Sequence, residues 1–161
     1  MNNIKLRIVE DKDAGFLFSI MNMETILDAL NEVPTKMADW ENAIKMWNED
    51  DDEEDYIVTD GDVPIGWFGI NGIASDNKMV YLKMAVILPR YHNKGIGCYV
   101  IKRMIELYKQ RGFSGISLYT DRDNHPAKAC YQKCGFTVME IFSEEMSNGK
   151  IVERCKMEFM F

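Results

Sequence analysis

The sequence lacks a long hydrophobic run, which excludes a membrane-spanning helix. Hydrophobic residues make up 47% of its 161 residues, yet no apolar stretch approaches the roughly 20 residues that such a helix needs. Residues 1–7 alternate polar and apolar side chains and lack the apolar centre of a signal peptide. We therefore expect a single domain over residues 1–161 that is cytoplasmic and has no membrane partner.

Basic residues are also in short supply. The chain has 19 Lys and Arg against 26 Asp and Glu, which gives a formal net charge of -7. Nucleic-acid-binding proteins normally present a basic stripe, and none is visible, so we expect no nucleic-acid partner. Much of the acidity lies in residues 49–55. Such a run is typical of a solvated, mobile loop, although it can also attract a polyamine or another polycation.

The cysteines lack the spacing of a zinc site. Cys130 and Cys134 are four residues apart on an expected helix, so they can lie near each other, whereas Cys98 and Cys155 are distant in sequence. We expect all four to be small buried side chains in a reducing compartment, and we expect no metal. Internal repeats, low-complexity segments and linkers are absent as well, so no domain boundary is indicated.

Hydrophobic periodicity and turn signals predict the element order β-α-α-β-β-β-α-β-α-β-β. A helix is expected after Pro34, with Thr35 as its cap. The strand–helix–strand unit over residues 79–120 implies one parallel pair. We therefore expect an α/β (α+β) fold, a mixed sheet of about seven strands flanked by about four helices. The strands are expected at residues 4–10, 56–59, 63–70, 79–88, 114–120, 137–146 and 151–161, and the helices from residue 11, after residue 34, and at residues 97–110 and 124–134.

A turn that can hold a phosphate joins the strand at residues 79–88 to the long central helix. The start of a helix leaves backbone amides unpaired and carries the positive end of the helix dipole. Gly95 and Gly97 allow a phosphate to approach the backbone, and Arg90 and Lys94 add positive charge. The turn is neither a P-loop nor a dinucleotide fingerprint. Taken alone, it can equally be a flexible entry turn.

A second motif is a helix that carries an amide and a phenol. Asn124 is a natural N-cap, and Pro126 falls in the first turn, where a missing N–H is tolerated. Ala127 and Tyr131 follow Asn124 by three and seven residues, so the three lie on one stripe of the helix. Each residue also has a purely structural interpretation, Asn124 as a cap and Tyr131 as a core aromatic.

Together the two motifs resemble the GNAT superfamily of acetyl-CoA-dependent N-acetyltransferases. Its pyrophosphate loop follows Gln/Arg-x-x-Gly-x-Gly/Ala, and here His92 takes the first position. His92 and Asn93 depart from the usual Gln/Arg-Gly, and the place of the family's strand bulge near residues 86–89 is open. The second signature, Asn-x-x-Ala-x-x-x-Tyr-x-Lys-x-Gly-Phe, is met at Asn124, Ala127, Tyr131, Lys133, Gly135 and Phe136.

The resemblance implies a GNAT fold with acetyl-CoA as co-substrate, held between two splayed parallel strands. An amine would attack the thioester directly, and Tyr131 would protonate the departing thiolate. Asn124 would bond the pantetheine arm. Backbone groups near Val86, Ile87 and Leu88 would bond the pantetheine and thioester, and the diphosphate would lie on the loop formed by His92, Asn93, Lys94, Gly95, Ile96, Gly97 and Cys98.

The catalytic base and the acceptor stay open. Asp121, Tyr119 and a water relay are candidates for the base. The expected acceptor is a primary amine of a small cationic metabolite; the alternatives are a protein or peptide N-acetyltransferase and a non-catalytic acyl-CoA-binding module. A homodimer would agree with what is common among members of the family. Three tryptophans could line an acceptor pocket, but packing in the core is the favoured interpretation for each; they are Trp40, Trp47 and Trp67.

Overall fold

Seven strands form one mixed sheet in the computed structural model, which describes residue 1 and residues 3–161. Asn2, part of the segment considered for a signal peptide, lies outside the described residues. The strands lie in the order β1-β2-β3-β4-β5-β7-β6, and β4–β5 is the parallel pair, as expected. Their bounds are β1 Ile4–Ile8, β2 Glu53–Asp60, β3 Val63–Asn71, β4 Met79–Ile87, β5 Gly115–Asp121, β6 Thr137–Glu145 and β7 Ile151–Met160.

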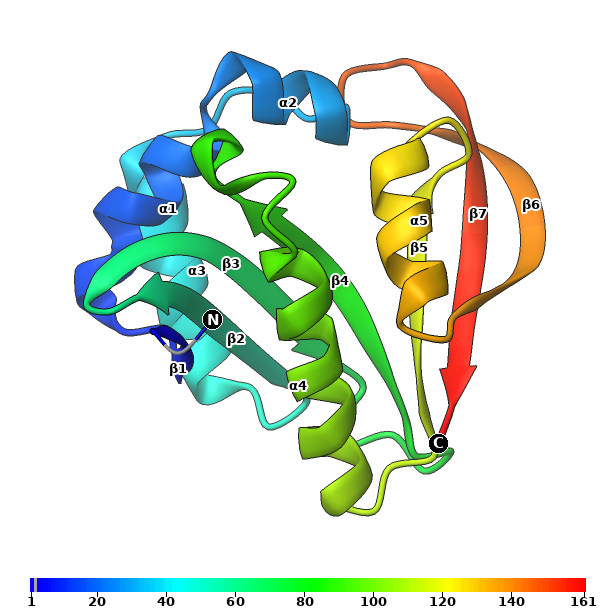
Figure 1. Cartoon of the computed structure of the whole chain (residues 1–161). Coiled ribbons are helices and arrows are strands. Elements are labelled where there is room, and N and C mark those ends of the chain that lie inside the picture. The colour runs from blue at the N-terminus through cyan, green and yellow to red at the C-terminus, as the bar shows by residue number, and fades with distance from the viewer. Residues whose placement is uncertain (2) are drawn as a thin grey trace.

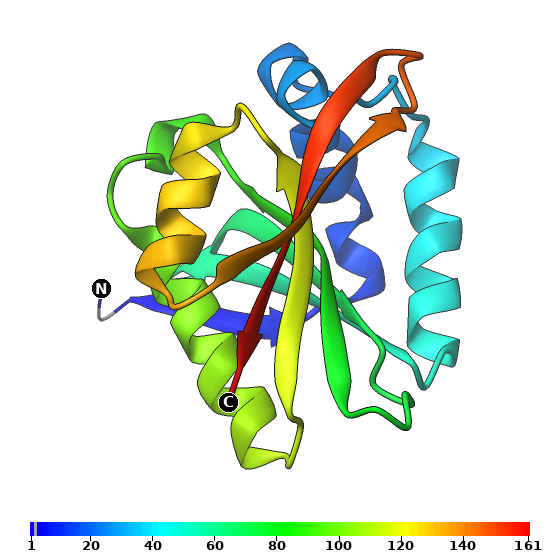
Figure 2. The ribbon, with the colours of Figure 1, turned by 90° about the vertical axis from the view of Figure 1, so that its right-hand side faces the viewer.

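Helices cover both faces of this sheet. Figures 1 and 2 show α1 and α3 on one face and α4 and α5 on the other. Within the described residues, none of the helices has both the length and the apolar character needed to cross a membrane. Their bounds are α1 Ala14–Met21, α2 Glu24–Leu30, α3 Met37–Glu49, α4 Ile96–Gln110 and α5 His125–Lys133, with short 3-10 turns at Asp11–Asp13 and Pro89–Tyr91.

Helix α2 and the cap of α3 differ from the sequence prediction. α2 was not expected, because Met23 at its N-cap offers no capping side chain and the helix ends at Asn31, in the left-handed region, rather than at a glycine. α3 begins one residue later than expected, and Asp39 accepts the Lys36 N–H at 2.7 Å. The Thr35 hydroxyl instead accepts the indole N–H of Trp40 at 2.8 Å.

The acidic run is only partly a solvated loop, which corrects that expectation. Its last three residues belong to β2, and Asp55 is 3% exposed. The carboxylate of Glu54 accepts hydrogen bonds from Tyr56, Tyr108 and Arg111 at 2.7–2.8 Å. Because Tyr108 and Arg111 belong to α4 and the residue that follows it, Glu54 connects that end of α4 to the sheet.

The tryptophans pack in the core between α3 and the sheet, as the favoured interpretation predicted. Trp40 and Trp67 are buried, and their ring centroids are 5.4 Å apart. Trp47 stacks on Trp67 at 5.3 Å. The indole N–H of Trp67 donates to Asp55 at 2.6 Å, and the Lys83 ammonium lies 4.6 Å from the centre of the Trp47 ring.

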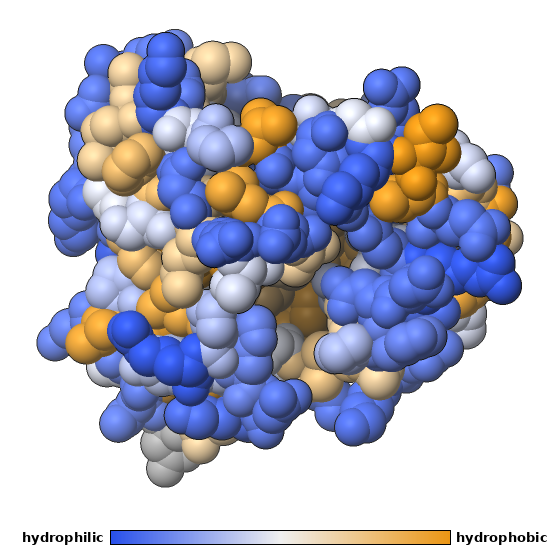
Figure 3. All heavy atoms as spheres, turned by 90° about the horizontal axis from the view of Figure 1, so that it is seen from above, coloured by the Kyte–Doolittle hydropathy of each residue, from blue (hydrophilic) through white to orange (hydrophobic). Residues whose placement is uncertain are grey.

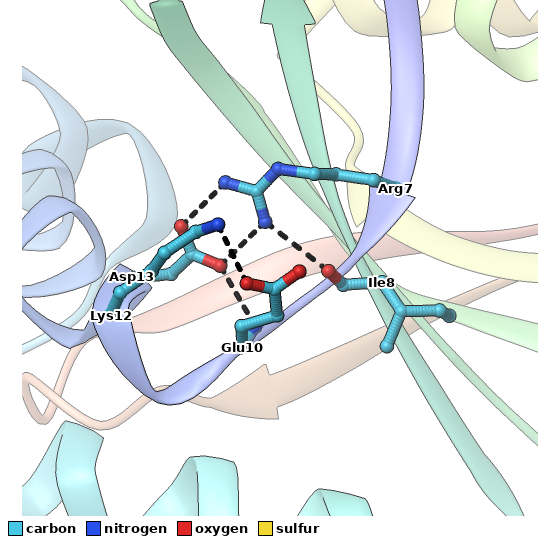
Figure 4. A network of polar contacts seen from close by, with 5 residues as sticks. All are labelled: Arg7, Ile8, Glu10, Lys12 and Asp13. Carbon is cyan, nitrogen blue, oxygen red and sulfur yellow. Dashed lines mark hydrogen bonds and ion pairs between the residues drawn. The ribbon is translucent and has the colours of Figure 1, made fainter. Parts of the chain in front are cut away.

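An ion pair joins β1 to the start of α1 (Figure 4). The Arg7 guanidinium donates two hydrogen bonds of 2.7 Å to the carboxylate of Asp13, which also accepts the Glu10 N–H at 2.8 Å. Burial alone raises the pKa of Asp13, but these hydrogen bonds outweigh it and hold the pKa below its usual range. Asp13 is therefore a charged group that the fold stabilises.

Candidate active site

The two parallel strands at the centre of the sheet splay apart. β4 and β5 pair from Met79–Gly115 to Leu82–Leu118, and the described residues show no later pair between them. Each strand continues to pair on its other side, β4 with β3 and β5 with β7. Figure 1 shows them separating toward the top, and Figure 3 shows the surface hollowed near the middle of that end. The sheet therefore has the gap that the resemblance implies.

A β-bulge in β4 begins where the pairing with β5 ends. Gly69 pairs with Met84 while Ile70 pairs with Leu82, so Lys83 is the extra residue. A bulge bends a strand and increases its twist. It can therefore turn the end of β4 away from β5. The extra residue of the bulge, Lys83, lies three residues before Val86. The sequence pattern had left the place of the bulge open.

Beyond the bulge, main-chain groups of β4 point alternately toward β3 and toward the gap. The Leu88 N–H donates to the Ile65 carbonyl at 2.8 Å, so it is already used by the neighbouring chain. Val86, two residues earlier, faces β3 in the same way. Of the three residues expected to bond the pantetheine, only Ile87 therefore points its main chain into the gap. Ala85 shares that direction, which the sequence argument missed.

The start of α4 presents free amides beside this gap. Gly95 is the N-cap with φ +75°, and Asn93 also has a positive φ of 58°. The Tyr99 N–H bonds back to the Gly95 carbonyl at 3.0 Å, and α4 has no side-chain cap. The three preceding amides, those of Ile96, Gly97 and Cys98, therefore have no acceptor within the helix. Together with the helix dipole they form an anion-binding cradle.

His92 and two cations shape the turn that leads into α4. His92 Nε2 lies 2.7 Å from the Ile87 carbonyl and must donate to it, so the imidazole ties the turn to the end of β4. Arg90 and Lys94 lie over the Tyr91 ring, at 5.4 and 5.2 Å from its centre. Neither cation forms an ion pair within the described residues. Both are available to an anion.

Helix α5 places Asn124 and Tyr131 as expected. The side-chain oxygen of Asn124 accepts the Ala127 N–H at 3.3 Å, so it is at least a cap. Tyr131 is half-buried against Phe136, with ring centroids 5.9 Å apart, and its hydroxyl has no partner among the described residues. Burial, and secondarily the neighbouring thiols, raises the pKa of Tyr131. The phenol thus stays protonated.

Aromatic side chains gather on the opposite face of the splayed strands. Leu82 and Leu118 pack in the α4 core, so by alternation Tyr81 and Tyr119 face away from α4. The Tyr119 ring lies 5.5 Å from the ring centres of both Tyr81 and Phe142. This face offers flat rings of the kind that attract ammonium groups.

Asp121, at the end of β5, is a poor candidate for the base. One of its oxygens accepts from the side chain of Asn31 at 2.7 Å, and the other accepts from Arg154 at 3.1 Å. Arg154 also pairs with Glu144 at 3.5 Å. Asp121 therefore connects the end of α2 to β7, while Tyr119 is 38% exposed.

Three of the four cysteines meet between α4 and α5. The sulfur atoms of Cys98, Cys130 and Cys134 all lie within 4.8 Å of one another. The Cys98 thiol donates to the Cys130 carbonyl at 3.7 Å, and the Cys134 thiol donates to the Cys98 carbonyl at 3.6 Å. Burial raises the pKa of Cys134 to about 11. Cys155 is buried separately in β7.

Comparisons with known proteins agree with this architecture. Mycothiol acetyltransferase from Corynebacterium glutamicum (strain R) is 27% identical over 94 residues, which is 58% of this chain but 31% of that protein, so the chain matches about a third of its length. The spermidine N-acetyltransferase from Vibrio cholerae, solved in complex with CoA and spermine, superposes with a TM-score of 0.89 at 22% identity. That match covers 99% of this chain and 96% of the other.

A dodecameric structure of spermidine N-acetyltransferase from Vibrio cholerae is similar as well. Its TM-score is 0.84 at 20% identity, and the match covers 99% of this chain and 95% of that one. At these identities the structures establish the shared fold. The model of the acetyltransferase (GNAT) family matches residues 20–136, well over half of the sequence. The chain therefore belongs to the GNAT family of acetyltransferases.

Proposed function

We propose that this chain transfers an acetyl group from acetyl-CoA to a primary amine of a small polycationic metabolite. The gap between β4 and β5 beside the free amides of α4 carries the proposal, because it offers an extended carrier both a strand edge and a diphosphate site. The pantetheine arm would lie along the main chain of Ala85 and Ile87. The diphosphate would bind at Asn93–Cys98, with Arg90 and Lys94 adding charge.

The chemistry needs no covalent enzyme intermediate. The Ile87 N–H faces the gap and would stabilise negative charge on the thioester oxygen. Tyr131 would give its proton to the departing thiolate as the C–S bond breaks. Full transfer between free groups, with pKa values of about 10 and 8.5, is uphill by about 2 kcal/mol. Since burial raises the pKa of Tyr131, proton transfer must accompany bond cleavage.

The acceptor would reach the thioester from the face that carries Tyr81, Tyr119 and Phe142. Flat rings and a net charge of -7 favour cations over anions. The Vibrio cholerae enzyme was solved with spermine, which belongs to this class and supports a polyamine acceptor. With both oxygens of Asp121 engaged, we assign proton removal to Tyr119 or to a chain of water molecules beside it.

Self-association is part of the proposal. The spermidine N-acetyltransferase of similar fold forms a dodecamer, and β6 is the outermost strand of the sheet here. That strand exposes Val138, Met139 and Ile141. A second copy would cover these apolar side chains.

The decisive assay measures CoA thiol release from acetyl-CoA with a panel of polyamines, aminoglycosides, amino acids and short peptides. We expect polyamines to give the highest kcat/KM. Faster turnover of peptides would favour a protein N-acetyltransferase. If acetyl-CoA binds tightly but no amine accelerates release, the chain is an acyl-CoA-binding module and the proposal fails.

A further inference from the structure

We infer that Cys98, Cys130 and Cys134 form a binding site for a soft, thiophilic metal ion, and that occupation of this site opposes acyl-CoA binding. The second half of this inference rests on the proposed function; the first half does not. The three thiols come from two helices, with Cys98 in the first turn of α4 and the other two near the C-terminal end of α5.

The spacing of the sulfur atoms is close to that of a metal site. With metal–sulfur bonds of about 2.3 Å, the sulfur atoms of a trigonal or tetrahedral site lie about 3.8–4.0 Å apart. Here all three pairs lie within 4.8 Å, so contraction by less than about 1 Å would complete the geometry. Small rotations of the side chains can supply this change. The helices need not separate.

Two of the three thiols hydrogen-bond to main-chain carbonyls within the cluster. Cys98 and Cys134 each donate to a main-chain carbonyl of the cluster, Cys98 to that of Cys130 and Cys134 to that of Cys98. Cys134 is buried, whereas Cys98 and Cys130 are half-buried, which gives an ion a path from solvent. No other Cys, His, Asp or Glu among the described residues joins the group.

The donor set selects the class of ion. Three sulfur ligands without an oxygen ligand favour soft ions such as Cu(I), Zn²⁺ and Cd²⁺ over Mg²⁺ or Ca²⁺. A divalent ion that binds the three thiols displaces their three protons to solvent, and the resulting site carries one net negative charge. That charge would lie beside the free amide of Cys98, where the diphosphate is proposed to bind. The bound ion would also fix the first turn of α4 to α5.

The first experiment titrates Cd²⁺ alone into the reduced full-length chain. We expect one equivalent to bind, with an ultraviolet thiolate-to-metal charge-transfer band. Cys98→Ala and Cys130→Ala should each weaken binding at least 100-fold, while Cys155→Ala should leave it unchanged. Circular dichroism of each metal-free variant confirms folding. Absence of stoichiometric binding, or equal binding by Cys130→Ala, would overturn the site.

The second experiment measures acetyl-CoA affinity by calorimetry with and without one equivalent of Cd²⁺. Acetyl-CoA is used because its sulfur is blocked. We expect affinity to fall at least tenfold in the natural chain and to stay constant in Cys130→Ala. An equal affinity with and without Cd²⁺ would refute the antagonism. If metal-free protein does not bind acetyl-CoA, the proposed function fails, while the cadmium titration still decides the metal site.

Discussion

Tyr131 shows how burial constrains the chemistry of a residue that a sequence motif singles out. The sequence places it one turn beyond Ala127 on the Asn124 stripe, and the structure leaves its hydroxyl without a partner in the described residues. Burial raises the pKa of Tyr131 rather than lowering it. A half-buried phenol of this kind stays protonated and is reluctant to lose its proton, so in the proposed mechanism its proton moves only as the C–S bond breaks.

Replacing Tyr131 with Phe should therefore lower kcat without changing cofactor affinity. General acids typically contribute roughly 10²- to 10⁴-fold, and we expect a loss in that range. Phe keeps the ring contact with Phe136, so the fold should persist. Stopped-flow thiol release gives kcat, and calorimetry with CoA gives the affinity. An unchanged kcat would remove Tyr131 from the mechanism.

The charge on Asp13 should make stability depend on pH. The pKa of Asp13 is lower in the folded chain than in the unfolded chain. Its charge therefore stabilises the fold fully above the usual carboxyl pKa of about 4, and this stabilisation is lost as the pH falls through the lower pKa of the folded chain. Asp13→Asn should reduce the free energy of unfolding by about 2 kcal/mol at pH 7. This loss is smaller than the loss on breaking a fully buried ion pair, because Arg7 is partly exposed.

Urea unfolding of both proteins between pH 7 and pH 3 measures this effect. The difference between Asp13→Asn and the natural chain should shrink toward pH 3. Glu153→Gln serves as the control, because the Arg122–Glu153 pair is about half exposed and its loss should leave the free energy of unfolding nearly unchanged. A difference that stays constant with pH would mean that Asp13 acts through packing rather than charge.

At the scale of elements, the turn between β4 and α4 joins the strand edge to the anion cradle. His92 holds the turn on Ile87, while Gly95 gives the left-handed N-cap that leaves three amides free. A residue with a Cβ is strained at this φ. A Cβ on Gly95 would also lie 3.0 Å from the Met1 side chain. The cradle therefore depends on the backbone of one glycine.

Gly95→Ala should raise the KM for acetyl-CoA about tenfold, equivalent to about 1.4 kcal/mol, because the amides would turn away from the diphosphate. Gly149→Ala is the matched control. Gly149 has a similar φ of +82° in the β6–β7 connection, with open space where a Cβ would lie. We expect comparable losses of thermal stability but a change in KM only for Gly95→Ala. Equal KM values for both variants would argue against diphosphate binding at this turn.

At the scale of the whole molecule, net charge should govern the encounter with the two substrates in opposite ways. The overall charge of -7 attracts a polycation at long range, and salt screens this attraction. Raising NaCl from about 50 to 300 mM should therefore increase the KM for spermidine several-fold. The KM for acetyl-CoA, itself an anion, should not follow the same trend.

Steady-state kinetics with spermidine and with a monoamine test this expectation. The monoamine carries less charge, so its KM should depend less on salt. If the KM values of both amines change equally with salt, long-range charge does not select the acceptor. Specificity must then arise at the aromatic face formed by Tyr81, Tyr119 and Phe142.

The sequence alone predicted the family, from its two motifs, and the succession of strands along the chain. It also predicted every helix except α2, because caps, turns and periodicity are signals within a few residues. Gly95 is the N-cap of α4 and Asn124 is the N-cap of α5, and both residues lie directly beside the helix that they cap. Helix α2 escaped prediction for the same reason, since its ends carry no strong local signal.

Only the tertiary structure decided which distant residues meet. The hydrogen bond of His92 to Ile87, the burial of Asp55 and the gathering of three thiols all depend on how elements pack. Cys98 lies in α4 and Cys130 in α5, with β5 between them in the chain, and no periodic pattern links them. Local physics fixes each element, whereas the free energy of packing many elements together sets the distances on which the chemistry depends.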